Sequence, residues 1–399
     1  MSTLTPFTNS TFSSANARRA GSRPLALRSF RCQCNRTVFF RNSECLACGT
    51  PLGYEPGTGL LLTLAPGPEV NTWQPLGAED GLLYRRCANF ATPSGCNWLV
   101  PAESAAVTQT LCMACTLNRT IPDLSIPDNG LLWGRVESAK RRLISSLLAL
   151  ELPVHSKLID DPVSGVAFDF LHPTAEQPSV MTGHDDGVIT INIEEADDAK
   201  REQIRAALHE PYRTLLGHFR HEIGHYYWDR LVRDSAWLEP YRALFGDERA
   251  DYAAALQQHY QNGPPTDWRM RYVSGYASVH PWEDWAETWA HYLHMVDTVD
   301  TARSFGLDSS DVDLAIEPFM PDALWQPEAV QGEGFLHFLN EWVGITAVMT
   351  ELSRSMGQPD FYPFALPRPA VAKLHFIHLL IQDAGSDAVK SSAPSFQNL

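Results

Sequence analysis

The segment His221-Glu222-Ile-Gly-His225 constrains the fold of this chain more than any other part of its sequence. On an α-helix, residues four apart lie one turn apart on the same face, so both imidazoles can reach one metal ion. Glu222 lies beside them, where its carboxylate can take a proton from water that a zinc ion activates. The pattern is short, and two surface histidines on an amphipathic helix are the alternative interpretation.

The sequence around this motif predicts a helix over residues 211–232. Pro211 suits a first helical turn, and no other proline occurs before Val232. Apolar residues recur at steps of three and four, as in a buried helical stripe, at Leu215, Phe219, Ile223, Tyr226 and Tyr227. Gly224 costs about 1 kcal/mol of helix propensity relative to alanine. We interpret it as a close backbone approach near the metal, with a merely tolerated glycine as the alternative.

A catalytic zinc ion takes three protein ligands and leaves one position for water. Residues 280–294 are the best source of the third ligand, because Glu283 and Glu287 lie one turn apart beside an apolar face. That face consists of Trp282, Trp285, Trp289 and Leu293. Carboxylates next to a dry aromatic surface are costly unless a cation lies there. We predict that Glu283 binds the metal and that Glu287 accepts the N–H of a ligand histidine. Glu287, Asp284 and His280 stay open as alternative ligands, and an ordinary solvated acidic helix is the other interpretation.

The motif and its downstream partner resemble a known arrangement. HEIGH followed by EDWAE is similar to the glutamate-zincin (gluzincin) active site, in which a second helix supplies the glutamate ligand. It is also similar to the active site of anthrax lethal factor, which implies that Tyr276 donates a hydrogen bond to the oxyanion. From GRVESAKRRLISSLLAL through TGHDDGVITINIEEAD to HPWEDWAETWAHYLH, the chain resembles a bacterial family of zinc-binding metallopeptidases with an N-terminal zinc ribbon. The resemblance covers roughly residues 30–385 and implies a fold and a chemistry, but no substrate.

All eight cysteines lie within the first 115 residues. An even number of cysteines indicates disulfides in a secreted protein, whereas close pairs indicate zinc in a cytosolic one. The elements CQC, CLAC and CMAC have the spacing of zinc knuckles, and no secretory signal precedes them. We predict two four-thiolate zinc sites, grouped as Cys32, Cys34, Cys45 and Cys48, and as Cys87, Cys96, Cys112 and Cys115. An interleaved grouping stays open, and free buried cysteines are the plain alternative.

Charge argues against nucleic acid as a partner. The chain has a net charge of −16, of which residues 1–126 contribute +3 before any thiolates are counted. No stripe of Lys and Arg with interleaved aromatic residues occurs, and an acidic chain repels phosphate backbones. We expect a peptide or protein substrate, and a protein contact or a structural role for the cysteine-rich module. No apolar run approaches the roughly 18 residues of a membrane helix, so we expect a cytoplasmic protein without membrane contact.

We predict an α+β fold in which a small β-rich zinc-ribbon module precedes a zincin-like metallopeptidase domain, mostly helical with a small mixed sheet. The expected parts are a disordered tail over 1–29, the module over 30–126, the peptidase domain over 127–385 and a flexible tail over 386–399. Residues 166–170 and 187–193 predict strands, and we expect the second to line the cleft and pair with extended substrate. Helices are expected over 131–150, 194–208, 245–260, 333–356 and 368–383.

Three more polar residues lie near the motifs. His218 could face the metal, but a supporting or surface role fits better, because the ligand set is already complete. His184 suits either the rim of a cleft or a turn. Asp229, one turn after His225, could accept a hydrogen bond from it or lie on a solvated face.

These observations together indicate a zinc-dependent metallopeptidase with one catalytic and two structural zinc ions. We expect His221, His225 and Glu283 to hold the catalytic ion and Glu222 to be the general base. The resemblance implies that Tyr276 stabilises the oxyanion. One alternative is a catalytically silent zincin-like interaction or regulatory protein. The other is a nucleic-acid-associated protease that is guided by its ribbon. Latency, in which the cysteine-rich module covers the cleft, also stays open.

Overall fold

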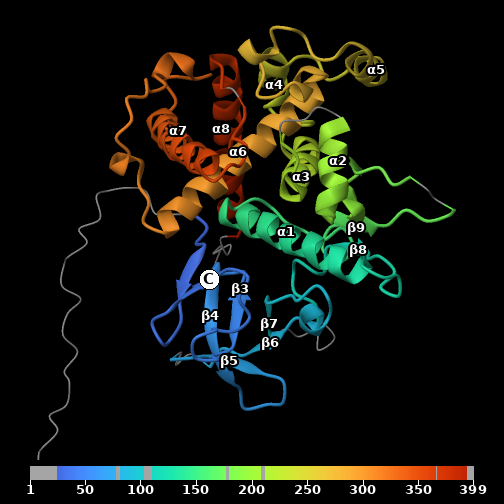
Figure 1. The fold of residues 1–399 in the computed structure, drawn as a ribbon, viewed down its shortest axis with the longest axis vertical. Coiled ribbons are helices and arrows are strands. Elements are labelled where there is room, and N and C mark those ends of the chain that lie inside the picture. Colours follow the sequence, from blue (N-terminus) through green and yellow to red (C-terminus); the bar gives the residue numbers. More distant parts are fainter. Residues whose placement is uncertain are drawn as a thin grey trace, which may run out of the picture.

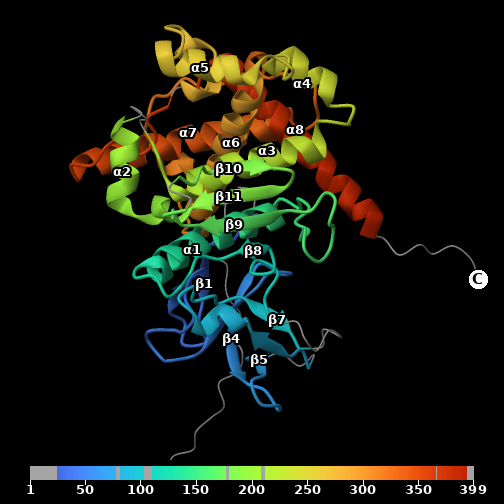
Figure 2. The same ribbon diagram turned by 90° about the vertical axis from the view of Figure 1, so that its right-hand side faces the viewer.

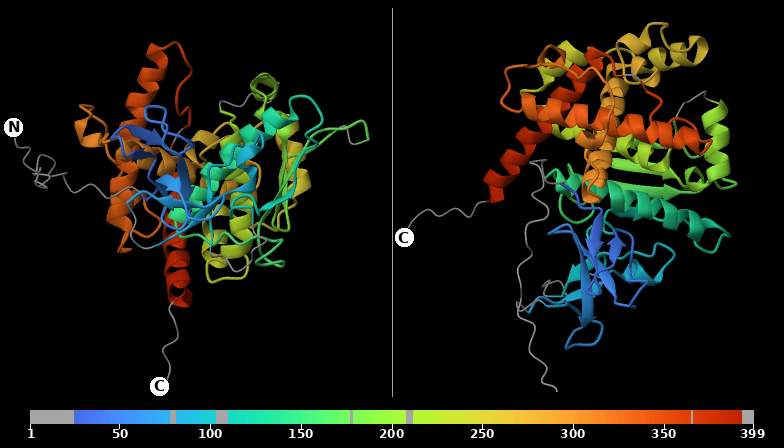
Figure 3. Two further views of the ribbon diagram at one scale, coloured as in Figure 1. Left: turned by 90° about the horizontal axis from the view of Figure 1, so that it is seen from below. Right: turned by 60° about the vertical axis from the view of Figure 1, so that its left-hand side comes forward.

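The computed structural model describes residues 25–77, 81–102, 110–176, 179–207, 212–364 and 366–392. A β-rich N-terminal part is followed by a mainly helical part that contains a further sheet (Figure 1). In the right-hand view of Figure 3, the N-terminal part lies below helix α1 (Asn129–Ala149) and the remaining helices lie above it.

The described residues between 25 and 115 form what we call the N-terminal module. A two-stranded antiparallel ribbon, β1 (Ser29–Arg31) and β2 (Thr37–Phe39), precedes a five-stranded antiparallel sheet in which neighbours along the chain pair with each other. The strands of that sheet are β3 (Leu52–Glu55), β4 (Leu60–Pro66), β5 (Trp73–Pro75), β6 (Tyr84–Arg86) and β7 (Leu99–Pro101). The strands are short, and the buried cysteines join Tyr54 and Trp98 in the core. A module with so few long apolar side chains is the kind that a structural metal stabilises.

The second sheet has the order β10-β11-β9-β8 (Figure 2). Its strands are β8 (Asn118–Thr120), β9 (Ala167–Leu171), β10 (Gly183–Asp185) and β11 (Val188–Asn192). β8, β9 and β11 are parallel, and β10 runs antiparallel to β11 at one edge. The expected strand over 187–193 is therefore present, but it is not the edge that could accept a substrate. A tight turn through Asp186 and Gly187, both with positive φ, folds β10 back over that edge.

β8 lies inside the range that we assigned to the cysteine-rich module, 30–126, yet it pairs with β9 of the second sheet. The residues that follow the last cysteine of the N-terminal module thus share backbone hydrogen bonds with the helical part. The local sequence shows only a short polar segment here, and the pairing partner lies about fifty residues further along the chain.

Helices pack on one face of the second sheet and against one another. Phe168 and Phe170 of β9 contact Phe219 of α3 (Leu215–Leu231), and Lys140 of α1 lies over the same two rings. α3 packs along α6 (Pro281–Ser304), which in turn contacts the C-terminal helices. The other helices are α2 (Asp198–Ala207), α4 (Leu238–Phe245), α5 (Tyr252–Asn262), α7 (Gly332–Ser355) and α8 (Arg368–Ser392). α8 continues beyond residue 385, where we had placed the end of the folded part.

Residues 25–28 contact α6, so the expectation of a disordered tail over 1–29 is wrong for these residues. The backbone N–H groups of Leu25 and Ala26 donate to the carboxylate of Asp300 at 3.0 and 2.8 Å. Arg28 is buried and donates to Asp297 and to two serines of α1. The partners on α6 lie some 270 residues away along the chain, so the composition of this segment alone could not reveal the contact. Residues 1–24 lie outside the described part of the chain.

Asp297 of α6 joins four segments of the fold. Its carboxylate accepts hydrogen bonds from Arg28 at 3.0 Å, from Arg142 of α1 at 2.7 and 2.9 Å, and from Arg220 of α3 at 2.7 Å. We call these four residues the Asp297 network.

Within the described residues, no helix is both long enough and apolar enough to cross a membrane.

Candidate active site

The HEIGH motif lies in the middle of α3. The helix begins at Leu215, later than the predicted Pro211, because the hydroxyl of Thr214 accepts a hydrogen bond from the N–H of Gly217 at 3.0 Å and caps it. Pro211 lies outside the described residues. The imidazole rings of His221 and His225 lie on one face, with ring centroids 4.9 Å apart.

Glu283 enters the site from α6, at the first turn of that helix. The Nδ1 atom of His280 accepts from the N–H of Trp282 at 3.1 Å, and Pro281 occupies the first turn, so the helix start is fixed next to Glu283. Glu283 is 2 % exposed. Its Oε2 atom lies 3.0 Å from Nε2 of His221 and 3.7 Å from Nε2 of His225. The structure therefore brings together the three residues predicted to hold the metal.

Gly224 allows α3 and α6 to approach closely at this point. A Cβ atom at position 224 would lie 3.2 Å from Cα of Ala286 and 3.2 Å from Cβ of Trp289. The indole N–H of Trp285 donates to the carbonyl oxygen of Gly224 at 2.8 Å. The close backbone approach expected for this glycine is thus between the two helices that carry the site.

The three side chains fit a zinc ion. Two ligands that lie 2.0–2.1 Å from a tetrahedral metal are separated by about 3.3 Å, close to the distances between Glu283 and the two histidines. The buried Oε2 atom of Glu283 makes no hydrogen bond to any described residue, although imidazole nitrogens lie near it. A buried carboxylate oxygen without a hydrogen-bond partner is costly. Together with the two imidazole nitrogens it forms a donor set that suits a divalent cation.

The electrostatics of the site favour a cation as well. Burial lowers the pKa of His225 to about 3, so its ring is neutral, the form that binds metal. Burial also lowers the pKa of His221, but the carboxylates of Glu283 and Glu287 raise it well above its ordinary range. Although burial opposes it, the nearby imidazoles of His221 and His225 and the hydrogen bond from Tyr252 lower the pKa of Glu283 to about 2. Positive charge is thus stabilised between these carboxylates.

Glu222 follows His221 on α3 and is nearly buried. Burial raises its pKa to about 7, against the opposing charges of His221 and His218. A carboxyl group that titrates near neutral pH can both accept and return a proton. The arrangement can therefore support general acid–base chemistry next to a metal ion.

Hydrogen bonds hold two of the three metal-facing side chains in place. Oε1 of Glu287 lies 2.8 Å from Nδ1 of His221, the contact predicted for Glu287, and leaves Nε2 of that ring facing Glu283. Ser274 donates to Oε2 of Glu287 at 2.6 Å. The hydroxyl of Tyr252, the first residue of α5, donates to Oε1 of Glu283 at 2.7 Å. The sequence interpretation missed Tyr252 and Ser274, because nothing in their local sequence distinguishes them from other polar residues on helices and loops.

Tyr276 lies at the edge of the site. Its ring centroid is 6.0 Å from that of His221, and it begins a short 3₁₀ turn, Tyr276–Ser278, before α6. Burial and the nearby carboxylate of Glu283 raise the pKa of its hydroxyl, which therefore stays protonated and able to donate. The oxyanion role that the resemblance implies for Tyr276 stays a prediction.

The alternative ligands have other partners. Lys373 of α8 donates to the buried carboxylate of Asp284 at 2.5 Å, and His280 Nε2 lies 3.0 Å from the carbonyl oxygen of Ala250. His218 contacts the carboxylate of Glu195. This contact agrees with a supporting role for His218 and not with a role as a fourth metal ligand.

The two remaining polar residues are also placed. His184 lies on β10, its ring 6.4 Å from that of His225, so it belongs to the rim of the site. Asp229 forms an ion pair with Arg233. Its side chain is only 19% exposed, so it does not lie on a fully solvated face, and Nδ1 of His225 makes no hydrogen bond to it or to any other described residue.

The cysteines gather into two groups of four, with the sequential grouping that we predicted. Cys32, Cys34, Cys45 and Cys48 form the first cluster, and Cys87, Cys96, Cys112 and Cys115 form the second. Sulfur atoms lie 3.6 Å apart in Cys32–Cys48, 3.7 Å in Cys34–Cys45 and 3.6 Å in Cys96–Cys112. Thiolates at about 2.3 Å from a tetrahedral zinc ion would lie roughly 3.8 Å apart. All eight are free thiols, so the geometry fits zinc rather than disulfides.

Comparison with known proteins bears on the family to which the chain belongs. A family model described as "Putative zinc-binding metallo-peptidase" matches residues 129–380, and a zinc-ribbon domain model matches residues 29–126. Uncharacterized proteins of Mycobacterium tuberculosis and Mycobacterium bovis are each 40% identical over 363 residues, which is 90% of this chain and 97% of the relative. No solved structure matches the chain. The chain therefore belongs to the family of zinc-binding metallo-peptidases that carry an N-terminal zinc-ribbon domain.

Proposed function

We propose that this protein hydrolyses peptide bonds as a gluzincin with a zincin-like fold. The observation that carries the proposal is the convergence of His221, His225 and Glu283 within 4.8 Å of one another, with Glu222 on the same helix. Zinc bound by the first three would polarise the substrate carbonyl and lower the pKa of water towards 7.

The residues of the chain divide the remaining work. The carboxylate of Glu222 accepts the proton of the attacking water and passes it to the nitrogen of the leaving amine. The hydroxyl of Tyr276 donates to the carbonyl oxygen as it gains negative charge. Glu287 holds the imidazole of His221 through Nδ1, and Tyr252 holds the carboxylate of Glu283 through Oε1.

The edge strand β10 gives a place for the substrate. It lies at the end of the sheet, contacts α3, and carries His184 beside His225. An extended peptide could add to the free edge of β10 through main-chain hydrogen bonds, which would bring its backbone past the zinc ligands. β10 thus takes the role that we had expected of the strand over 187–193.

Glu222→Gln tests the mechanism directly, because it keeps the shape of the side chain and removes its basicity. With a panel of denatured proteins as substrates, we expect wild-type protein to cleave and the variant to lose on the order of 100-fold or more in rate. Both proteins should hold three zinc ions per chain, two at the cysteine clusters and one at the active site. Glu202→Gln, at an exposed position on α2, is the matched control.

Two results would contradict the proposal. One is full turnover by Glu222→Gln on a substrate that the wild type cleaves. The other is wild-type protein with three zinc ions that cleaves nothing in the panel, which is the expected behaviour of a silent, regulatory relative. A zinc count of two in His225→Ala, against three in wild type, would separately support the assigned metal ligands.

A further inference from the structure

A second site lies between the N-terminal module and the helical part. An open cavity of about 870 Å³ is lined by Phe40, Arg41 and Pro93 of the module, by one face of α1, by α2, and by the start of α3. None of the residues proposed to bind zinc or to act in hydrolysis lines it. Cavities of about 300–1,000 Å³ are of the size that holds a small molecule.

The charged side chains of this cavity are almost all arginines. Four arginines line it, at positions 41, 135, 142 and 201, against the single carboxylate of Asp198. This is unusual in a chain with a net charge of −16. The cavity therefore concentrates positive charge at one place on an acidic protein.

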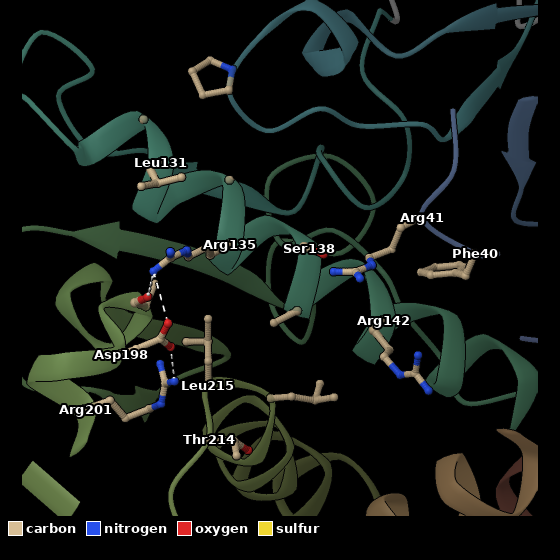
Figure 4. Close-up of a pocket in the computed structure, with 16 residues that line it drawn as sticks. Phe40, Arg41, Leu131, Arg135, Ser138, Arg142, Asp198, Arg201, Thr214 and Leu215 are labelled. Carbon is tan, nitrogen blue, oxygen red and sulfur yellow. Dashed lines mark hydrogen bonds and ion pairs between the residues drawn. The ribbon is translucent and has the colours of Figure 1, made fainter. Parts of the chain in front are cut away.

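These arginines differ in how far their charge is neutralised. Arg142 is held by both carboxylate oxygens of Asp297, at 2.7 and 2.9 Å. Arg135 and Arg201 share Asp198, whose oxygens lie 3.8 and 2.5 Å from them, as Figure 4 shows. Arg41 is exposed and has no hydrogen bond or ion pair with any residue that the structure describes. In Figure 4 its guanidinium reaches from the module toward Ser138 on α1.

The start of α3 adds to this positive potential. Thr214, Leu215 and Leu216 line the cavity at the N-terminus of a 17-residue helix. The first N–H groups of a helix have no partner within the helix, and its dipole places partial positive charge there. The hydroxyl of Thr214 takes only the N–H of Gly217. Arginine side chains and a helix N-terminus from different elements therefore converge on one cavity.

The remaining wall is apolar. Leu131 of α1, which is 59% exposed, lies with Leu216 and Pro93 around the same space. A ligand that satisfies both kinds of wall has an anionic head for the guanidinium groups and an apolar body for the leucines. Guanidinium groups bind phosphate and carboxylate alike through paired N–H donors.

We propose that this cavity binds a small organic anion, a phosphate or carboxylate group attached to an apolar part, with Arg41 and Arg135 as its main charged contacts. Because Arg41 belongs to the N-terminal module and Arg135 to α1, the ligand joins the two parts of the fold. It also contacts the first turn of the helix that carries the HEIGH motif. The site is independent of peptide hydrolysis, since none of its residues belongs to the zinc cluster.

The test uses zinc-loaded, full-length protein and two probes that share an apolar ring, phenyl phosphate and 3-phenylpropionate, with calorimetric titration. We expect saturable binding of at least one probe, and a loss of roughly tenfold or more in affinity in Arg41→Gln and in Arg135→Gln, since each removes a charge-assisted contact. Arg85→Gln removes the same charge from strand β6 of the module, outside the cavity, and should bind as wild type does. Binding of one probe alone identifies the head group as phosphate or carboxylate.

Two outcomes would overturn the proposal. The first outcome is that neither probe binds saturably at millimolar concentration. The second is that a probe binds Arg41→Gln and Arg135→Gln as tightly as it binds wild type. The second result would place the anion elsewhere, for example at the zinc ion. Unfolding midpoints without probe should match among the variants, which shows that any loss of binding is not a loss of fold. Because the readout is binding, a failure of this proposal leaves the proposed hydrolysis untouched, and the reverse also holds.

Discussion

Replacing Asp297 by Asn should destabilise the whole protein, because this carboxylate is the only acidic member of the Asp297 network. It is 4% exposed and accepts hydrogen bonds from three guanidinium groups, those of Arg28, Arg142 and Arg220. Two of these arginines are themselves nearly buried, with side chains 2% and 7% exposed. Asparagine has the same shape but no charge, so it leaves buried cations without a counter-ion.

Removing one partner of a buried ion pair typically costs about 3–5 kcal/mol. We expect a loss within this range for Asp297→Asn, rather than three times as much, because the three arginines share one carboxylate and act as a unit. Such a loss corresponds to a fall of roughly 4–6 °C in the unfolding temperature, since the unfolding entropy is about 2.1 cal/mol/K per residue and the chain has 399 residues. The surface pair of Asp360 with Arg354 offers a matched control, since Asp360→Asn also removes a carboxylate from an arginine.

The loss of stability in Asp297→Asn should depend on pH, and it should become smaller at low pH. Burial raises the pKa of Asp297, but the charges of Arg28, Arg142 and Arg220 outweigh it and hold that pKa well below its ordinary value near 3.9. A carboxylate with a depressed pKa stabilises the folded state above its unfolded pKa and loses this contribution as the pH falls through its folded pKa. The difference between wild type and Asp297→Asn should therefore be constant above about pH 5 and shrink below about pH 4.

Urea unfolding of the zinc-loaded full-length chain, at a series of pH values, measures this difference. Asp360→Asn is carried through the same series, so that loss of zinc at low pH affects both variants equally. An Asp297→Asn midpoint equal to that of Asp360→Asn at pH 7 would refute the reasoning. So would a difference between the two variants that grows as the pH falls from 5 to 3.

Three further predictions concern the zinc sites and the helices that hold them. Tyr252→Phe removes the hydrogen bond to Glu283 and should weaken zinc binding at the active site by about tenfold or more in a chelator competition, whereas Tyr260→Phe, exposed on the same helix, should not. Gly224→Ala should destabilise the protein in urea by on the order of 1 kcal/mol, because overpacking of about 1–3 kcal/mol exceeds the gain in helix propensity. Gly334→Ala, where a new Cβ meets nothing within 4 Å, should be neutral or stabilising, and equal effects at both glycines would contradict the argument. Removal of zinc with a chelator should unfold the N-terminal module and make residues 25–115 sensitive to protease, and unchanged protection would show that the thiolates do not hold a structural metal.

Much of the site could be predicted from the sequence because its chemistry is encoded in short spacings. The i, i+4 spacing of His221 and His225 places them together on any helix, and the tryptophan-rich stretch around Glu283 indicated a buried carboxylate. The structure brings these residues together, and it groups the cysteines in sequence order. The regular elements with a strong period, such as the helix over 333–356, also lie where the pattern predicts them.

The features that the sequence did not reveal depend on contacts between distant parts of the chain. Tyr252 reaches Glu283 only because α5 packs next to the start of α6, and no local pattern encodes that placement. Arg28 looked like part of a polar tail, since its partner Asp297 lies on a helix far along the chain. The edge position of β10 was missed because three residues, Gly183 to Asp185, are too few to show an alternation of apolar and polar side chains.

The crossing of β8 into the second sheet has a consequence for how such proteins can be divided. A fragment that begins at residue 127 would lack β8 and would leave one side of β9 unpaired, a template for association with other chains. It would also lack the anchor that Arg28 makes to α6. Since Cys115 lies three residues before β8, a metal ion held by the second cysteine cluster would help to fix this strand in the sheet beneath the HEIGH helix. Exchange of the N-terminal part for another domain at residue 127 would therefore remove a strand from the sheet on which the HEIGH helix packs.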